Sequence, residues 1–121
     1  MSAWVWAAVA GVGGAAAIAR FLVDSRISER SGRELPYGTF AVNISGALLL
    51  GFLSGLAIAG DLLVIAGTAT IGSYTTFSTW MFETHRLAED RELSGSVINI
   101  GVSLLVGFAA ALVGHAIGAN T

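Results

Sequence analysis

The sequence contains no cysteine, which excludes disulfide bridges and thiolate metal sites. Charge is also scarce: charged residues make up 12% of the 121 residues, and the net charge is only −2. Such a small charge argues against a nucleic-acid partner. Hydrophobic residues reach 55%, and the mean hydropathy of +0.77 is far above that of a soluble domain. The composition therefore predicts a membrane protein.

Four apolar segments occur, each close to the roughly 20 residues that cross a hydrocarbon core. They cover residues 4–23, 40–59, 62–86 and 97–118, and they predict a single four-helix transmembrane domain spanning residues 1–121. The first segment follows Met1-Ser2 without a basic residue and is longer than a signal-peptide core, so it is expected to be retained. An even number of crossings would place both termini on one side.

Three connectors separate these segments. Residues 24–37 and 87–96 are rich in charge and are expected to be solvated loops, whereas Gly60-Asp61 is expected to be a tight turn. Basic residues concentrate on one side of the predicted topology, at Arg26, Arg30, Arg33, Arg86 and Arg91. Because Lys and Arg favour cytoplasmic loops, the first and third connectors are predicted to be cytoplasmic. We expect a multi-pass protein of the inner (plasma) membrane.

Glycine pairs mark the second and fourth segments. Gly51 and Gly55, and Gly114 and Gly118, have the spacing that lets two helices approach closely in lipid. The frequency of glycine, 16 residues in all, could also produce such pairs without any packing role.

The polar stretch from Gly72 to Trp80 lies inside the third apolar segment, where unpaired polar groups are costly. Gly72 and the Thr/Ser cluster after it can interrupt a helix near its middle. An interruption frees carbonyls, which suit a hard cation, and amides and hydroxyls, which suit an anion. Phe77 and Trp80 share a helix face beyond it, with Ser78 and Thr79 alongside. Ring edges can bind a small anion weakly, although such a pair is also common in ordinary packing.

Other polar residues lie within the predicted spans. Arg20 near the end of the first segment either snorkels to the interface or places a positive charge at the mouth of an aqueous vestibule. Asn43 offers an uncharged amide to a passing anion or to a neighbouring helix. Asn99 and Ser103 share one helix face, which is as typical of interhelical hydrogen bonds as of a pore lining.

With these residues in view, nearly the whole chain resembles the Fluc/CrcB family of fluoride channels. Two motifs carry the resemblance. Residues 38–46, Gly-Thr-Phe-Ala-Val-Asn-Ile-Ser-Gly, are similar to the family's second-helix pattern. Residues 72–79, Gly-Ser-Tyr-Thr-Thr-Phe-Ser-Thr, resemble the break in its third helix. Gly14 and Arg20-Phe21 fit its first helix more loosely.

The resemblance implies an all-α membrane protein that forms an antiparallel dimer, with two fluoride pores and a structural sodium ion at the dimer centre. It implies that Gly72 and Thr75 bind sodium through their carbonyls and that Arg20 lies at the vestibule. The fluoride pore would be lined by Asn43, Phe77, Ser78, Thr79, Trp80 and Ser103. The sequence departs from the pattern at Trp80, where the family usually has phenylalanine, and this puts one pore in doubt.

The function expected from this resemblance is passive, selective export of fluoride, which gives fluoride resistance. The partners would be fluoride, membrane lipid, and a second subunit that is either the same chain or a related one in opposite orientation. In the latter case the chain could be a nonconducting member of a pair. A small multidrug-resistance-type cation exporter is the other alternative, but it needs a deeply embedded carboxylate, and Asp24, Asp61 and Glu83 lie away from mid-span. No catalytic constellation is present, so an enzyme is not expected.

Overall fold

The computed structural model describes residues 2–32 and 36–121, and these residues form helices without any β-strand. The helices are α1 (Ala3–Ser31), α2 (Tyr37–Gly55), α3 (Gly60–Leu63), the π-helix η1 (Val64–Ile71), α4 (Gly72–Tyr74), α5 (Ser78–Glu89) and α6 (Leu93–Ala119). Within the described ranges, α1, α2 and α6 are each long and apolar enough to cross a membrane. The expectation of an all-helical membrane protein is therefore confirmed.

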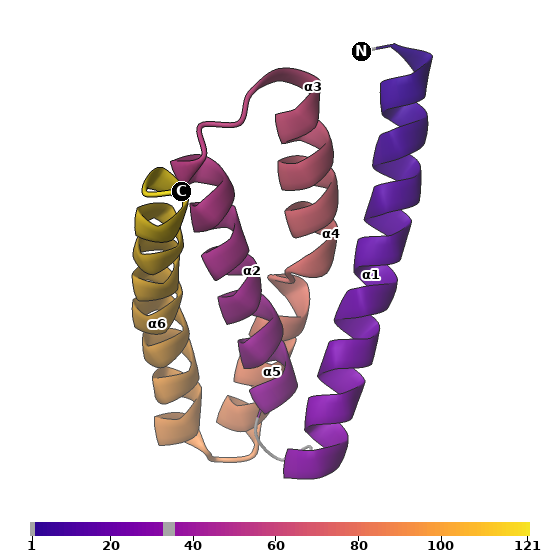
Figure 1. Cartoon of the computed structure of the whole chain (residues 1–121). Coiled ribbons are helices and arrows are strands. Elements are labelled where there is room, and N and C mark those ends of the chain that lie inside the picture. The colour runs from indigo at the N-terminus through magenta and orange to yellow at the C-terminus, as the bar shows by residue number, and fades with distance from the viewer. Residues whose placement is uncertain (1, 33–35) are drawn as a thin grey trace.

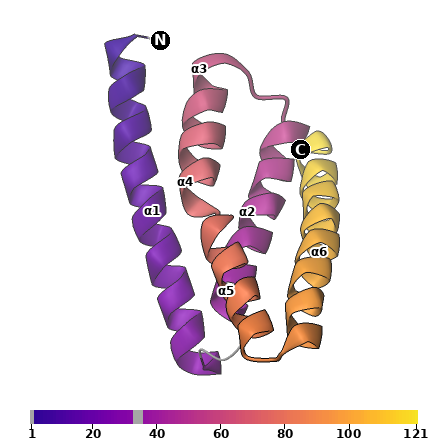
Figure 2. The ribbon, with the colours of Figure 1, turned by 180° about the vertical axis from the view of Figure 1, so that it is seen from behind.

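The helices run side by side as a bundle in which α2 lies between α1 and α6 (Figure 1). The helices from α3 to α5 form a further, interrupted column, and α5 returns beside α6 (Figure 2). Both ends of the chain lie towards the same end of the bundle (Figure 1). Large apolar side chains such as Leu105 on α6 and Trp4 on α1 are exposed, as expected of surfaces that face lipid rather than water.

The prediction that residues 24–37 form a loop is wrong for most of the part that the structure describes. The helix α1 continues through this charged stretch to Ser31, and Ser28 Oγ donates to Asp24 Oδ1 across one helical turn at 3.2 Å. The charged residues after Val23 mark the end of the apolar part of α1, but the backbone remains helical. The helix ends where Gly32 adopts a φ of 82°, a conformation that glycine reaches without strain.

The other two connectors also differ from prediction. The turn after α2 lies at residues 56–59, where Ala57 has a φ of 57°, and Gly60-Asp61 already begins α3. The third connector shrinks to residues 90–92 because α5 ends in a Schellman motif. In it, Glu92 N–H donates to Leu87 O at 2.8 Å and Arg91 N–H donates to Ala88 O at 3.2 Å. Glycine usually fills the left-handed position of this motif, so Arg91, with a φ of 61°, gave no sequence signal.

The glycine pairs are packing sites, which is one of the two alternatives that the sequence left open. Each of them lies against the backbone of the opposite helix in a seam between α2 and α6. A Cβ at Gly51 would overlap Ala111 O, and one at Gly114 would overlap Leu48 O; Gly55 and Gly118 make equivalent contacts with His115 O and Phe52 O. Because glycine has no side chain, the backbones of α2 and α6 come into direct contact at these four positions.

The third apolar segment is interrupted, as the polar stretch predicted. Its first part includes the π-helix η1. π-Helices are rare in proteins, and those that occur are often at functional sites. Gly72 remains helical, and the chain leaves helical geometry only from Thr75, which is extended with ψ at 161°. Helix α5 then begins at Ser78. We call residues 75–77 the break.

Candidate functional site

The break is held by one side chain of α2. Asn43 Nδ2 donates to Thr76 O at 2.9 Å, and Thr76 N–H donates to Asn43 Oδ1 at 2.8 Å. The amide thus replaces both hydrogen bonds that the backbone of Thr76 would have made in a continuous helix. Without such a partner, this part-buried peptide group would lack both of its backbone hydrogen bonds. The second N–H of Asn43 has no partner within the described residues.

Glycine makes room for the break on the same face of α2. A Cβ at Gly46 would overlap the Cγ2 methyl of Thr75, so glycine at this position lets Thr75 lie directly against the helix. The hydroxyl of Thr75 points back along α4 and donates to Ile71 O at 2.9 Å. Gly46 and Asn43 are one turn apart, and together they fix two successive residues of the break.

Thr76 also starts the next helix. Its Oγ1 accepts from the backbone N–H of Thr79 at 3.3 Å and donates to Thr79 Oγ1 at 3.2 Å. Bonding from a Thr oxygen to the N–H three residues later is the usual way of capping a helix N-terminus. The hydroxyl of Thr76 therefore satisfies one backbone N–H in the first turn of α5.

The break leaves the carbonyls of residues 72–75 without the donors of a continuous helix. In a continuous helix, Thr76 N–H would donate to Gly72 O and Thr79 N–H would donate to Thr75 O. Here the first N–H bonds to Asn43 and the second to Thr76 Oγ1. Gly72 and Thr75, the two residues expected to hold sodium, are thus among the residues whose carbonyls lose their helical donors; within the described residues, Ser73 O and Tyr74 O receive no backbone donor across the break either. Carbonyl oxygens without donors are suitable ligands for a hard cation.

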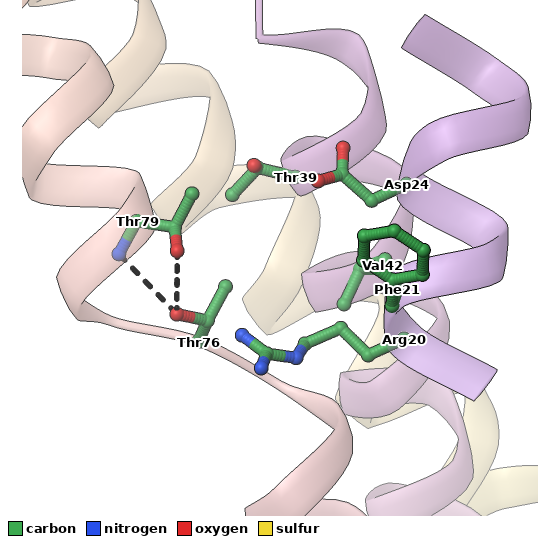
Figure 3. Close-up of a pocket in the computed structure, with 7 residues that line it drawn as sticks. All are labelled: Arg20, Phe21, Asp24, Thr39, Val42, Thr76 and Thr79. Atoms are coloured by element: carbon green, nitrogen blue, oxygen red, sulfur yellow. Dashed lines mark hydrogen bonds between the residues drawn. The ribbon is translucent and has the colours of Figure 1, made fainter. Parts of the chain in front are cut away.

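A cavity of about 120 Å³ lies beside the break, between α1, α2 and the start of α5 (Figure 3). Its walls include Arg20, Asp24, Thr39, Thr76 and Thr79. In Figure 3 the side chain of Arg20 extends from α1 towards Thr76, while Asp24 lies beside Thr39. The expected vestibule residue and one expected pore residue, Arg20 and Thr79, therefore line the same cavity.

Two buried donors in this cavity lack partners. Arg20 Nε and Thr39 Oγ1 are inaccessible to solvent and have no hydrogen bond within the described residues, and Thr39 as a whole is only 2% exposed. A cationic N–H and a hydroxyl suit an anion or a water molecule. The sequence analysis missed Thr39 as a candidate. Its position one turn before Asn43, on the same helix face, was the available signal.

The expected aromatic pair forms. The rings of Phe77 and Trp80 meet edge to face, with centroids 5.7 Å apart and an interplanar angle of 74°. Phe77 is 70% exposed, so one side of the pair lies at the surface of the chain. Ser78 is exposed too, whereas Trp80 is half-buried.

The interface between α5 and α6 is polar at one level. Thr84 accepts a hydrogen bond from Asn99 Nδ2 at its Oγ1, at 2.8 Å, and one from Ser96 Oγ at its carbonyl, at 3.0 Å. Asn99 therefore serves as an interhelical contact, one of the two alternatives for it. Ser103 lies one turn further along α6 and lines a second cavity, of about 310 Å³, which Tyr37, Phe40 and Asn99 also line.

The structure thus gathers part of the predicted site and separates the rest. Asn43 contacts the break directly. Arg20 and Thr79 line one cavity together with Thr76 of the break. Phe77 pairs with Trp80. Ser103 faces a different cavity, on the side of α6. Within the described part of the chain, no group of three or more His, Asp or Glu side chains could hold a metal ion.

Comparison with known proteins places these observations in a family. Residues 7–115 match the family model described as CrcB-like protein, Camphor Resistance (CrcB). The chain is 52% identical over 111 residues to a protein of Mycobacterium tuberculosis named Fluoride-specific ion channel FluC 2, covering 92% of this chain and 88% of the relative. It is 41% identical over 121 residues to Fluoride-specific ion channel FluC 1 of Symbiobacterium thermophilum, covering 95% and 96%.

Proposed function

The chain belongs to the CrcB-like family, and from this membership we infer that it is a fluoride-selective channel of the membrane. The observation that carries this function is identity above one half to a protein named as a fluoride-specific channel, over nearly the full length of both chains. A channel performs no chemical step, so the protein is not an enzyme. Fluoride crosses passively, down its electrochemical gradient. The cation-exporter alternative is not favoured, because the relatives bear the name of an anion channel.

We propose that the chain crosses the inner membrane four times. Helices α1, α2 and α6 are three of the crossings, and the interrupted column from Gly60 to Glu89 is the fourth. The break would lie within the hydrocarbon layer, and the hydrogen bonds from Asn43 support this, because they satisfy a peptide group that could not bond to lipid. The exposed apolar faces of α1 and α6 would contact lipid.

We propose further that two chains of opposite orientation form the working unit. The polar break supports this, since a solitary chain would leave the exposed Ser78 and the half-buried Thr75 and Thr76 against lipid. The partner is either the same chain or a related one.

A sodium ion at the centre of this dimer is a further proposal. The carbonyls of Gly72 and Thr75 would hold it, and the loss of their helical donors to Asn43 and Thr76 fits that role. Bound there, the ion would supply positive charge and a fixed point between two breaks. The chain's own contribution is to hold the carbonyls in place through Asn43 and Gly46.

Fluoride would enter at the cavity where Arg20 raises the local concentration of anions. From there hydroxyls of Ser78, Thr79 and Ser103, the amide of Asn43 and the ring edges of Phe77 and Trp80 would replace its water in stages. None of these groups except Arg20 carries a positive charge, so the ion is held weakly and can leave.

The function can be tested in bacterial cells whose own fluoride exporter has been deleted. We expect expression of the chain to restore growth in millimolar fluoride. Phe77→Ile should weaken this protection, and Phe82→Ile, which changes an equally exposed ring on α5, is the matched control. Absence of rescue by membrane-inserted wild-type protein would contradict the function for the chain acting alone. Rescue only with a co-expressed relative would indicate a heteromeric channel.

A further inference from the structure

The short helix α4, which leads into the break, is joined to α2 by one tyrosine. Tyr74 OH lies 2.9 Å from Ser45 Oγ. The hydroxyl of Ser45 donates its one proton to Val42 O at 3.1 Å, so Tyr74 is the donor to Ser45. A Cβ at Gly46 would lie 3.4 Å from Tyr74 Cδ2, which places the edge of the ring close to α2. The side chain of Tyr74 is therefore held on α2 at both its ring and its hydroxyl.

Three consecutive residues, 74–76, contact one turn of α2. Tyr74 bonds to Ser45, Thr75 lies against Gly46, and Thr76 bonds to Asn43. In both views of the ribbon, α4 lies between α1 and α2 (Figure 1 and Figure 2). On the α1 side, a Cβ at Gly13 would lie 3.1 Å from Ser73 Oγ, so glycine lets α4 approach closely there too. The residues before the break are therefore packed on two sides.

Tyr74 lies within the stretch whose carbonyls the break frees. Within the described residues, the carbonyls of residues 72–75 receive no backbone donor across the break. Among these four residues, Tyr74 is the one whose side chain hydrogen-bonds to α2 in the described part of the chain. Because each peptide group is planar, fixing the backbone of Tyr74 also limits the directions that its own carbonyl and that of Ser73 can take.

The direction of these carbonyls matters for a cation. Oxygen ligands must lie at defined distances from a hard cation, and selection among cations depends on the size and the flexibility of the set of oxygens. A loosely held set adapts to a larger ion, whereas a firmly held set does not. Gly72 and Thr75, the proposed sodium ligands, lie on either side of Tyr74 in the chain, so the hold on Tyr74 bears on both.

We propose that Tyr74, through its hydrogen bond to Ser45, is a positioning residue that fixes the freed carbonyls in the arrangement that suits sodium better than potassium. This inference rests on the proposed function, because it takes the central sodium ion as given. The tyrosine does not touch the ion and acts only through the backbone. Ser45 and Tyr74 belong to the two sequence motifs, 38–46 and 72–79, and the resemblance implied no role for either residue.

The test removes one hydroxyl and keeps the ring. Thermal unfolding of the full-length protein in detergent is followed while sodium chloride or potassium chloride replaces N-methylglucamine chloride at constant ionic strength. For each ion, the concentration that gives half of the rise in thermal midpoint is recorded. We expect Tyr74→Phe to raise this concentration roughly fivefold for sodium, the effect of losing one hydrogen bond, and to change it less for potassium. Tyr37→Phe, at the other tyrosine of the chain, is the control and should change neither value.

A hydrogen bond that only stabilises the fold gives a different result. It would lower the midpoint equally in all three salts and leave both half-effect concentrations unchanged, and that result would overturn the proposal. Ser45→Ala removes the other end of the same bond, so we expect it to raise the sodium value as Tyr74→Phe does. The double variant should then show little further change. Additive effects of the two substitutions on the sodium value would also contradict the proposal.

These outcomes are distinct from conduction. If the wild-type chain passes no fluoride but has a sodium-dependent midpoint that Tyr74→Phe weakens, the proposed function fails and the role of Tyr74 stands. If the wild-type chain passes fluoride and its midpoint does not respond to sodium, the role of Tyr74 fails and the proposed function stands.

Discussion

Asn43 shows how one side chain can satisfy the backbone of an interrupted helix. Its amide presents a donor and an acceptor side by side, as a peptide group does, and it engages both groups of Thr76. Serine or threonine could satisfy only one of them well, and a charged residue would be expensive at this depth. The residue expected to touch fluoride therefore has a structural task as well.

Replacing Asn43 should reveal that task. Asn43→Ala leaves the N–H and carbonyl of Thr76 without partners, so we expect the free energy of unfolding to fall by about 2 kcal/mol. Asn43→Asp keeps the acceptor and loses the donor. Asn120→Ala, which removes an exposed contact to Ala116 O at the C-terminus, is the control.

Thermal unfolding in detergent, followed by size exclusion, measures these changes, and efflux assays on the same samples report on conduction. We expect Asn43→Ala to lose fluoride flux even at temperatures where the dimer persists. An Asn43→Ala protein with wild-type thermal stability would contradict the structural task, and one with wild-type flux would contradict its place in the pore.

At the scale of single residues, the sequence predicted which residues make up the site better than it predicted the contacts between them. It indicated the polar stretch, Asn43 and Arg20 from their chemistry. It could not show that Asn43 bonds to Thr76, since 33 residues separate them and only tertiary packing brings them together. Thr39 was missed for the same reason: a threonine near a helix start is ordinary until its burial is known.

At the scale of elements, the seam between α2 and α6 depends on four glycines that lie against backbone atoms. In lipid, apolar side chains gain little by leaving one apolar medium for another, so close packing must supply the association. The seam holds α6 firmly on α2, the helix that carries Asn43 and Gly46.

A methyl group in this seam should force the helices apart. Gly114→Ala places a Cβ against Leu48 O, and we expect it to lower the free energy of unfolding by about 1–3 kcal/mol. Gly101→Ala on the same helix is the matched control, because a Cβ there meets nothing within 4 Å. It should be neutral or stabilise slightly, since alanine favours helix over glycine. Equal thermal midpoints for the two variants would show that the seam is not tightly packed.

The lengths of the apolar runs predicted where the helices lie, but not where they end. The charged residues after Val23 predicted a loop, yet they extend α1 by two turns, because charge tells where lipid ends and not where hydrogen bonding ends. The break was predicted near Gly72 and lies three residues later, where Asn43 and Gly46 can hold it. Glycine permits an interruption, but partners on α2 decide its position.

At the scale of the whole molecule, polar groups of the break near Phe77 lack partners within the described part of the chain. A polar break at the surface of the chain, with carbonyls that have lost their helical donors, leaves polar groups for a neighbouring chain or an ion to satisfy. The proposals of an antiparallel dimer and a central sodium ion account for these features together.

Sodium should then stabilise the assembled protein. At a concentration 100 times its dissociation constant, a ligand that binds only the folded state adds about 2.7 kcal/mol. We expect replacement of sodium by N-methylglucamine to lower the thermal midpoint and the dimer fraction, and potassium to restore them less well. Identical midpoints in the three salts would contradict a structural sodium site.

The most direct measurement of the account as a whole is fluoride efflux from liposomes that contain the purified chain alone, with chloride as the control ion. We predict rapid efflux of fluoride, little efflux of chloride, and slower fluoride efflux in Phe77→Ile while the dimer remains assembled. Equal permeability to both ions, or no fluoride efflux from correctly inserted dimers, would contradict the claim that this chain forms a fluoride-selective channel.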